Sequence, residues 1–556
     1  MLTVLFSWMI IGGASLLFGK AVTDSVYKDR LEEMGRPDIY IMTGVIFLNV
    51  FAQFFSLFYK VAGIACAILG LAGIVIAAVW AYSGIRHKKR WTLFPGCERK
   101  RPELWRIAAL LLALVFTLLW TTQSPGQYDT GLYHAQAVRW IEDYGVVPGL
   151  GNLHMRLAYN SAFMSLQALF SLGWLVGQSL HTLNGFFCLA ALCYAFSTIR
   201  LWGRESCRVS DLLKCVMVIY VVQKRYDISS SGTDILAMLL ILYLFIKWSE
   251  YRERGREDGV LYGYLCLVSV YAVTVKLSAA SAVVLALYPL YLFLKNKNVR
   301  AVFAHVAAGL LILLPFLIRN VIISGYLVYP YGGLDLFQVD WKMDKEVLAR
   351  DSLDIKMFAR GIQNSAEYDT SMIGWIPRWF LNQSMGNRIV LAVGALCIPA
   401  ALYLLWKSFR EKRYAQGALL GASLVNLIFW LSAAPHIRYG GPYIYVLAAI
   451  TVGGGVKWTY RNRILSVAAV IVLLPYLASY GAKVTEVSQT LAEHLIRQPD
   501  YLAWPGTQYP VGNQHIWMPD EGDLIGYFAF PATPQGNQFK ALELRGESFR
   551  EGFRHE

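Results

Sequence analysis

Charged residues are scarce in this sequence. Only 16% of its 556 residues are Asp, Glu, Lys or Arg, whereas 56% are hydrophobic, and the mean hydropathy is +0.43. That balance is far too apolar for a soluble globular protein of this length. Because buried backbone groups must be satisfied within a bilayer, the sequence predicts an all-α protein that crosses a membrane many times.

Several catalytic signatures are absent as well. The chain has no Walker P-loop, no HExxH, no CxxC pair and no GxSxG, which argues against nucleotide-driven transport, zinc proteolysis and serine hydrolysis. Six of the eight cysteines lie in apolar stretches, and Cys97 and Cys207 lie in basic segments. We therefore expect no disulfide framework in the exported loops.

The net charge of +14 does not indicate nucleic-acid binding, because the basic residues fall in short clusters between apolar stretches. This pattern is typical of cytoplasmic loops and of contact with anionic lipid. We expect membrane lipid, and no nucleic acid, as a partner. The clusters are Arg86–Arg106, Arg200–Arg208, Arg252–Arg256, Lys295–Arg300, Lys407–Arg413 and Lys457–Arg463.

About fourteen apolar stretches approach the roughly 20 residues needed to cross a bilayer. Placing every basic cluster in the cytoplasm orients them consistently, with both termini outside, and predicts an integral protein of the bacterial inner (cytoplasmic) membrane. The weakest stretch is Ser210–Val222, which is short and contains Lys214. The others are Leu2–Phe18, Tyr40–Phe58, Val61–Ser83, Trp105–Thr121, His181–Trp202, Asp234–Trp248, Val260–Val275, Leu277–Leu294, Ala301–Ile323, Ile389–Trp406, Ala418–Ala434, Tyr439–Gly455 and Leu465–Ala482.

Three parts follow from this layout. Residues 1–104 form accessory spans with a basic cytoplasmic loop, residues 105–482 form the main transmembrane domain, and residues 483–556 form an external tail, either a small irregular domain or a flexible extension. The main domain carries external loops at residues 123–180 and 324–387.

The first external loop is expected to hold interfacial helices. Apolar residues recur at helical spacing between Ala137 and Tyr144, and Trp140 suits the membrane boundary. Glu142 and Asp143 are assigned to the solvated face of this helix. The stretch Ser161–Leu172 is too short to span and is expected to lie along the interface.

Ionisable residues gather near the outer ends of the predicted spans. Any one of them is also compatible with a snorkelling interfacial charge. Charges this close to the apolar region are costly, however, and often pair or meet a ligand. Several cations on one face predict an anionic ligand at the outer leaflet. The residues are Asp129, Asp234, Lys276, Arg319, His436 and Arg438.

The order of these features resembles the GT-C-fold membrane glycosyltransferases over about Trp105–Ala482. The matching segments are YDTGLYH (Asp129, Tyr133), GVVPG (Gly145, Pro148), Thr233–Asp234, the lysine Lys276, RNVIISGYLVYP (Arg319, Asn320, Gly325, Pro330) and RYGGP (Arg438, Tyr439, Pro442). Thr130 stands where many members have a second acid. The amino-terminal spans and the tail have no counterpart in the resemblance.

The resemblance implies transfer of a sugar from a polyprenyl-phosphate carrier to a glycan, lipid or protein acceptor on the outer face. Asp129 is then the general base, and cations stabilise the departing phosphate. A divalent cation is an open possibility, and no other cofactor is expected. The implied substrate-binding residues are Tyr128, Tyr133, His134, Asp234, Lys276, Arg319, His436, Arg438 and Tyr439.

Two alternatives remain open. An envelope polysaccharide polymerase or ligase would share the spans and long loops but would use lipid-diphosphate oligosaccharides. A lipid-linked saccharide flippase or transporter would instead carry inverted repeats and ionisable groups near the midplane.

Overall fold

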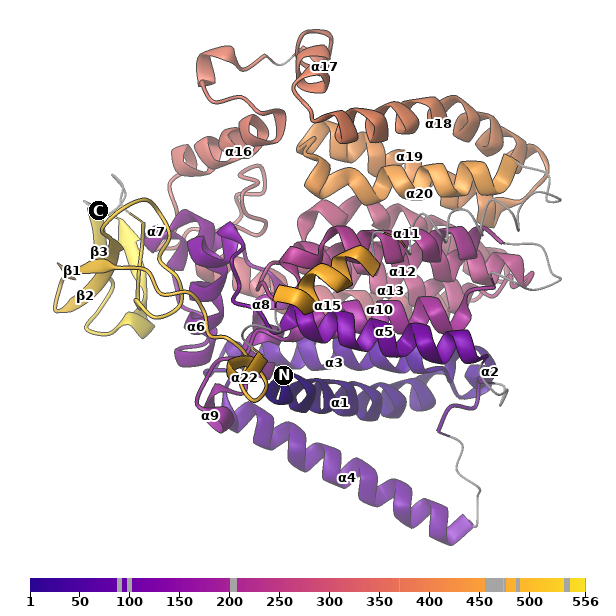
Figure 1. Cartoon of the computed structure of the whole chain (residues 1–556), viewed down its shortest axis with the longest axis horizontal. Helices are drawn as coiled ribbons and strands as arrows, with labels where there is room; N and C mark the ends of the chain where they lie inside the picture. Colours follow the sequence, from indigo (N-terminus) through magenta and orange to yellow (C-terminus); the bar gives the residue numbers. More distant parts are fainter. Residues whose placement is uncertain are drawn as a thin grey trace.

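A bundle of long helices forms most of the protein (Figure 1). The computed structural model describes residues 1–87, 93–97, 103–200, 208–369, 371–455, 474, 477–486, 491–534 and 541–555. Among these residues, eight helices are long and apolar enough to cross a membrane. This composition is compatible with an integral membrane protein.

Thirteen of the fourteen predicted stretches are helical, and the last, Leu465–Ala482, lies largely outside the described residues. The exact number of membrane crossings stays a prediction. A short α2 (Leu31–Met34) and the 3₁₀ segment η5 (Leu277–Ala286) connect parts of the bundle. Its long helices are α1 (Leu2–Val26), α3 (Pro37–Ser56), α4 (Gly63–His87), α5 (Leu104–Thr121), α10 (Leu183–Thr198), α11 (Val209–Gln223), α12 (Asp234–Glu253), α13 (Gly259–Val275), α14 (Leu287–Lys295), α15 (Val299–Ser324), α18 (Met385–Arg410), α19 (Tyr414–Ala433) and α20 (Ile437–Gly455).

The two ends of the bundle differ. Residues 123–180, the second external loop and the tail gather at one end, which we call the loop end (Figure 1). The clusters Arg252–Arg256 and Lys295–Arg300 follow α12 and α14 at the other end, which we call the basic end. The two termini both lie at the loop end, where the Met1 ammonium group donates a hydrogen bond of 2.6 Å to the carbonyl of His494.

Glycines bring α1 and α3 into close contact. A Cβ added at Gly19 would lie 1.7 Å from the Tyr40 carbonyl oxygen, and one at Gly44 would lie 1.9 Å from the Ser15 carbonyl oxygen. Helices in an apolar medium associate by such close packing of small residues. The predicted accessory helix α3 is therefore an integral part of the bundle and aligns its carboxyl end with the first external loop.

The loop end contains six shorter helices. Those of the first loop are α6 (Ala135–Asp143), α7 (Leu150–Leu153), α8 (Ala162–Phe170) and α9 (Gly173–Val176), and those of the second are α16 (Lys345–Arg360) and α17 (Met372–Leu381). All residues of α8 are buried. The expectation that Ser161–Leu172 lies along the interface is therefore wrong, because α8 packs inside the protein against α3 and α6.

The tail covers one face of helix α6, whereas Asp143 is exposed, as expected. Trp140 is fully buried, and its ring packs against Phe530 and Phe553 of the tail. The Glu142 carboxylate accepts hydrogen bonds from the hydroxyls of Ser179 (2.8 Å) and Tyr527 (2.6 Å), so the assignment of Glu142 to the solvated face is wrong. Burial of this carboxyl raises its pKa, and the hydroxyl donors oppose that rise.

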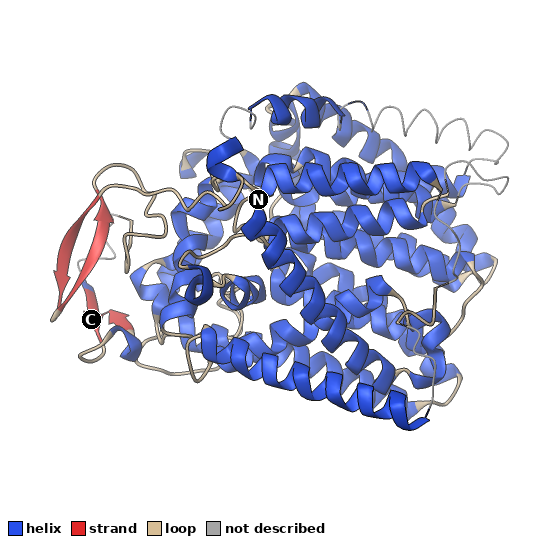
Figure 2. Ribbon diagram, turned by 60° about the horizontal axis from the view of Figure 1, so that its bottom comes forward, coloured by secondary structure: helices blue, strands red, loops and turns tan. Residues whose placement is uncertain are grey.

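The tail corrects the all-α prediction. Strands β1 (Gly506–Val511) and β2 (Gln514–Pro519) form one antiparallel pair, and β3 (Leu542–Leu544) and β4 (Phe553–His555) form another (Figure 2). A short helix α22 (Leu491–His494) precedes them. The tail is thus a small folded unit that covers the first loop, which agrees with the expectation of a small domain rather than a flexible extension.

Two glycines in GVVPG shape the turn on which the tail docks: Gly145 packs against the end of α3, and Gly149 lies against β4. Gly145 and Gly149 have φ angles of +85° and +64°, in the left-handed region that glycine tolerates. A Cβ at Gly149 would lie 2.0 Å from the Phe553 carbonyl oxygen. The carbonyl of Pro148 accepts a hydrogen bond of 3.0 Å from the Phe553 amide, so this turn holds β4 in place.

Replacing Gly149 with alanine should therefore loosen the tail. The left-handed backbone alone costs about 1–2 kcal/mol for alanine, and the clash with Phe553 adds to it. Gly177→Ala is the matched control, because Gly177 has a φ angle of +74° with no heavy atom within 4 Å of an added Cβ. Limited proteolysis of the purified proteins should cleave the tail faster in Gly149→Ala only, and equal cleavage rates would contradict this role.

Candidate functional site

Four charged side chains from distant parts of the chain meet at the loop end. The Arg438 guanidinium donates from Nη2 to Asp129 Oδ2 and from Nε to Asp234 Oδ2, each at 2.5 Å. The Lys276 ammonium group bonds the other oxygen of Asp234. We call these residues the charged quartet. The predicted convergence of Asp129, Asp234, Lys276 and Arg438 is confirmed.

The charged quartet is only partly enclosed. The Asp234 side chain is 7% exposed, whereas those of Asp129, Lys276 and Arg438 are 21–25% exposed. Two carboxylates balance two cations, so the cluster is neutral as it stands. A ligand that approaches from the loop end meets three of the four side chains without any need to unfold the bundle.

The backbone at the start of a helix positions Asp129. It lies just before the π-helical turn η2 (Thr130–His134), which runs directly into α6. The carbonyl of Gly131 accepts hydrogen bonds from the amides of Ile525 (3.0 Å) and Gly526 (2.8 Å) of the tail. Such π turns are frequent at functional sites, where they re-aim side chains.

Asp234 occupies the first turn of α12, where a negative charge is favoured by the exposed backbone amides. The loop before it is fixed by side-chain amides. Asn184 Nδ2 donates to the carbonyls of Ser230 and Gly232, each at 2.9 Å, and Gln167 Nε2 donates to that of Ser231 at 2.8 Å. The polar SSSGT segment is thus a rigid support for Asp234.

The two cations stand at helix ends. Lys276 follows the last residue of α13 with an extended backbone, and the Ser161 hydroxyl donates to the preceding carbonyl of Val275 at 2.7 Å. Arg438 begins α20 after a tight turn, in which the Trp430 indole donates to the carbonyl of His436 at 2.9 Å. Both cations therefore project from backbone that is held in place.

Aromatic residues of the predicted site surround the charged quartet. The Lys276 ammonium group lies 4.5 Å from the centroid of the Tyr439 ring, a cation–π contact. Burial raises the pKa of the Tyr133 hydroxyl, and the charges of Asp129 and Tyr439 add to that rise. His436 stacks on Phe358 of α16 at 5.2 Å, and burial together with Arg438 lowers its pKa.

His134 lies beneath these residues and is 2% exposed. Its Nδ1 atom has no hydrogen-bond partner among the described residues. Burial lowers its pKa to about 4, although Asp129 and Asp234 oppose that effect. The imidazole is therefore neutral near pH 7, and it can donate or accept one hydrogen bond toward the quartet.

Two predicted site residues point elsewhere. Tyr128 is 54% exposed and donates its hydroxyl to Asp523 of the tail, and burial and this carboxylate raise its pKa to about 12. Arg319 is 2% exposed and donates to Asn160 Oδ1 (3.1 Å) and Ser56 Oγ (2.5 Å). Arg319 thus ties α15 to the first loop and α3 rather than joining the quartet.

Arg156 is a cation that the sequence analysis did not single out. Its charge interacts with those of Asp129, Asp351 and Tyr133, and it makes no ion pair within the described ranges. It lies in η3 (Met155–Ala158), far from any predicted span end. Position relative to the spans therefore gave no signal for it, and only folding of the first loop brings it within electrostatic range of Asp129.

Asp351 of α16 is the second residue that was missed. It is fully buried, and its Oδ2 accepts hydrogen bonds from the hydroxyls of Tyr159 (2.5 Å) and Tyr329 (3.0 Å). Burial raises its pKa, while the two tyrosines and Arg156 oppose that rise. Asp351 therefore anchors the second external loop to the first, behind Arg156.

The electrostatics suit a phosphate ligand better than a metal ion. Burial would raise the pKa of Asp129, but His134 and the Arg438 guanidinium lower it below its ordinary value. No group of three or more His, Cys, Asp or Glu side chains that could hold a metal ion occurs among the residues described. Both quartet carboxylates already bond cations, so these residues do not fit the divalent cation considered from the sequence.

Comparison with known proteins identifies one family. A domain of unknown function, DUF8201, matches residues 1–445. No curated protein and no solved structure matches the chain significantly.

Asp234 should hold the quartet together. Asp234→Asn leaves Lys276 and Arg438 with one carboxylate between them, so we expect a loss of about 1–3 kcal/mol in the free energy of unfolding. This is below the ~3–5 kcal/mol of a fully buried pair, because both cations are partly exposed. The double variant Asp234→Asn/Lys276→Met should recover part of this loss. Thermal unfolding in detergent of the wild type, the two single variants and the double variant measures the coupling between Asp234 and Lys276. Strictly additive losses of stability would contradict that coupling.

The buried His134 should make the protein sensitive to acid. The unfolded chain takes up a proton near pH 6.5, whereas folded His134 resists protonation down to about pH 4. Stability is therefore fully present above pH 6.5 and is lost as the pH falls toward 4, by at most ~3 kcal/mol from this residue. Unfolding temperatures measured between pH 7 and 4.5 should fall less steeply for His134→Asn than for the wild type. Parallel curves would show that His134 contributes nothing.

Proposed function

The chain belongs to the DUF8201 family, whose function is unknown, and we propose from its charged quartet that it is a membrane glycosyltransferase. The donor is a polyprenyl-phosphate-linked sugar, and the acceptor is a glycan, a lipid or a protein. The observation that carries this proposal is the Asp129–Arg438–Asp234–Lys276 cluster, partly exposed at one end of an apolar bundle.

Phosphate recognition is the first step of the proposed mechanism. Arginine binds phosphate oxygens with two parallel hydrogen bonds, and lysine supplies a compact charge. Arg438 and Lys276 are held by carboxylates in the ligand-free protein, whereas Arg156 is not ion-paired among the described residues. A lipid phosphate therefore meets Arg156 first and then competes with Asp129 for Arg438.

This competition activates Asp129. While Arg438 bonds Asp129, the pKa of the carboxyl is low and the carboxylate is a weak base. When the donor phosphate takes up the guanidinium, Asp129 loses its main cationic partner and its pKa rises. The base therefore becomes effective only after the donor is bound, which protects the donor from early reaction.

The transfer step replaces one bond at the anomeric carbon with another. The acceptor hydroxyl oxygen forms a bond to the anomeric carbon, while the bond from that carbon to the phosphate oxygen breaks. Asp129 takes the hydroxyl proton, and the polyprenyl phosphate leaves with the bonding electron pair. Arg438, Lys276 and Arg156 stabilise the charge on the leaving phosphate. General base catalysis of this kind supplies roughly 10²–10⁴-fold in rate.

The proposal places the loop end on the outer face of a bacterial inner membrane, with fourteen crossings. The clusters Arg252–Arg256 and Lys295–Arg300 lie at the opposite end of the bundle, in keeping with the excess of Lys and Arg in cytoplasmic loops. Both termini lie at the loop end, which is consistent with an even number of crossings.

A lipid-diphosphate donor is the second candidate, which would make the protein a polysaccharide polymerase or ligase. Three cations at one site favour this alternative, since a diphosphate carries more charge than a monophosphate. The chemistry at Asp129 would be unchanged. Assays with both donor types distinguish the two.

Asp129→Asn should abolish sugar transfer. Asn cannot accept the hydroxyl proton, so membranes with matched expression should transfer labelled sugar at least about 100-fold more slowly than the wild type. Asp227→Asn is the matched control, because Asp227 lies just before the SSSGT segment and α12 at the same end of the bundle but bonds Lys224 and not the quartet. A fully active Asp129→Asn protein, or no transfer from either donor class by the wild type, would overturn the proposal.

Arg156 should act mainly on donor binding. Loss of one charge-assisted hydrogen bond costs about 1.5–3 kcal/mol, so Arg156→Gln should raise the KM for the donor about 10-fold or more. The KM for the acceptor should change little. An unchanged donor KM would remove Arg156 from the site, and steady-state kinetics with each substrate varied in turn measures both constants.

A further inference from the structure

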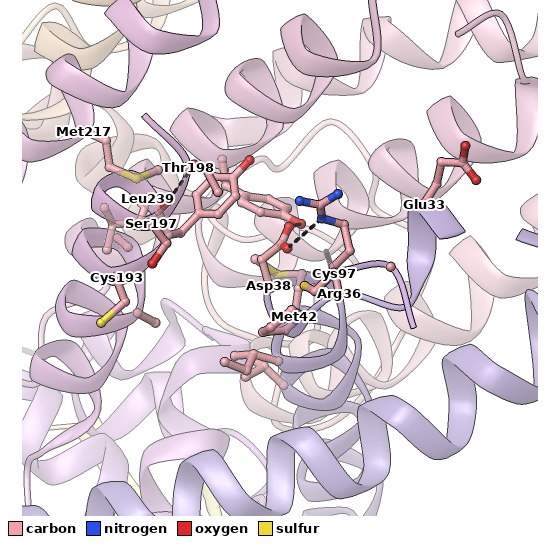
Figure 3. Close-up of a pocket in the computed structure, with 18 of the residues that line it drawn as sticks. Glu33, Arg36, Asp38, Met42, Cys97, Cys193, Ser197, Thr198, Met217 and Leu239 are labelled. Carbon is pink, nitrogen blue, oxygen red and sulfur yellow. Dashed lines mark hydrogen bonds and ion pairs between the residues drawn. The ribbon is translucent and has the colours of Figure 1, made fainter. Parts of the chain in front are cut away.

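A large cavity opens at the basic end, away from the charged quartet. It has a volume of about 900 Å³ and is enclosed by α3, α10, α11 and α12. Figure 3 shows Arg36 and Asp38 side by side in this cavity, with Glu33 on one side and Met217, Leu239 and Thr198 on the other. The proposed transfer chemistry uses none of these residues.

The cavity is deep, and its walls combine apolar residues with polar and charged ones. It reaches from Arg254, just past the end of α12, to Leu236, two residues after Asp234, which corresponds to ~27 Å along the helix axis. Met42, Ala191 and Met217 face it from the neighbouring helices. A narrow space of this length accommodates an extended chain better than a compact solute.

The entrance is lined by cations whose carboxylate partners are already engaged. Arg36 Nε lies 3.9 Å from Asp38 Oδ1, while Lys247 Nζ takes the other oxygen of Asp38 at 2.6 Å. The Arg36 guanidinium donates no hydrogen bond within the part of the chain that the structure describes.

A second entrance arginine is similarly placed. Arg254 Nη2 lies 4.0 Å from Glu250 Oε2, and Glu250 also bonds Lys214 at 2.8 Å. By contrast, Arg256 is firmly paired with Glu33 at 2.7 Å. Within the part of the chain that the structure describes, Arg36 and Arg254 therefore retain capacity for another anion.

We propose that this cavity binds an anionic lipid, with its phosphate at Arg36 and Arg254 and one hydrocarbon chain along α12. Guanidinium groups suit phosphate oxygens, and anionic head groups favour the basic face of a membrane protein. Hydrocarbon in the apolar part avoids the cost of leaving that space to water. The site does not depend on the proposed glycosyl transfer.

Retention of lipid during purification tests both the phosphate contact and the part of the cavity that holds the hydrocarbon chain. Arg36→Gln removes the phosphate contact, and Ala190→Trp fills the cavity wall. The matched controls are Arg30→Gln, whose arginine pairs with Asp258 at the same end outside the cavity, and Ala77→Trp on the exposed face of α4. Each protein is purified in detergent, washed extensively, and analysed for lipid phosphorus per chain and for lipid identity by mass spectrometry.

We expect about one tightly held phospholipid per wild-type and control chain, and at least a tenfold loss of it in both cavity variants. Mass spectrometry then tells a glycerophospholipid of the surrounding leaflet from an isoprenoid phosphate. Equal retention in Ala190→Trp and the wild type would overturn the proposal. Because Arg36→Gln and Ala190→Trp act on different parts of the cavity, one unstable variant leaves the other as the test.

Free phosphate is the competing explanation, and a thermal shift distinguishes it. Phosphatidylglycerol in mixed micelles should raise the unfolding temperature of delipidated wild type but not that of Ala190→Trp. Inorganic phosphate at the same concentration should have no such effect. Equal stabilisation by inorganic phosphate would show a simple anion site and overturn the lipid assignment.

Discussion

The Arg438 guanidinium between Asp129 and Asp234 is the interaction on which the loop end depends. Two carboxylates this close would repel one another in a partly dehydrated setting, and the guanidinium with Lys276 removes that cost. The three helices that supply these residues, together with the first loop, must therefore end at the same level. The quartet is at once a structural lock and the most polar place that a ligand can reach from that side.

The tail secures this arrangement from outside. Its strands and aromatic residues bury Trp140 and Glu142 on α6, and its backbone amides hold the carbonyl of Gly131, two residues after Asp129. Arg319 is fully buried between α15, α3 and the first loop, and its hydrogen bonds hold that loop from inside the bundle. Asp129 thus stands on a segment that is packed on both faces, as its proposed role of general base requires.

Helix α12 links the two charged regions of the molecule. Every residue from Asp234 to Tyr251 is buried, so the helix runs through the centre of the bundle with the quartet at its first turn. Its other end carries Lys247 and Glu250 in a buried ionic network beside the cavity. Buried charges at both ends of one apolar helix fix its depth and its rotation, because any slip would leave an ion unpaired in a poorly hydrated place.

Much of this architecture was predictable from the sequence, because apolar runs of spanning length must become helices in a bilayer. The alternation of basic clusters also placed Asp129, Asp234, Lys276 and Arg438 at one end, and that juxtaposition is confirmed. Local pattern carried no information on α8, which is apolar and short whether it lies on a membrane or inside a protein.

By itself, the sequence determined the helices, their order and the end at which the polar segments collect, since these follow from hydropathy and charge along the chain. Only the tertiary structure decided which charges pair, because pairing depends on distances between residues hundreds of positions apart. It brought Arg156 and Asp351 to the site, turned Tyr128 and Arg319 away from it, folded the tail onto Trp140, and opened a cavity among four helices that no single helix encodes.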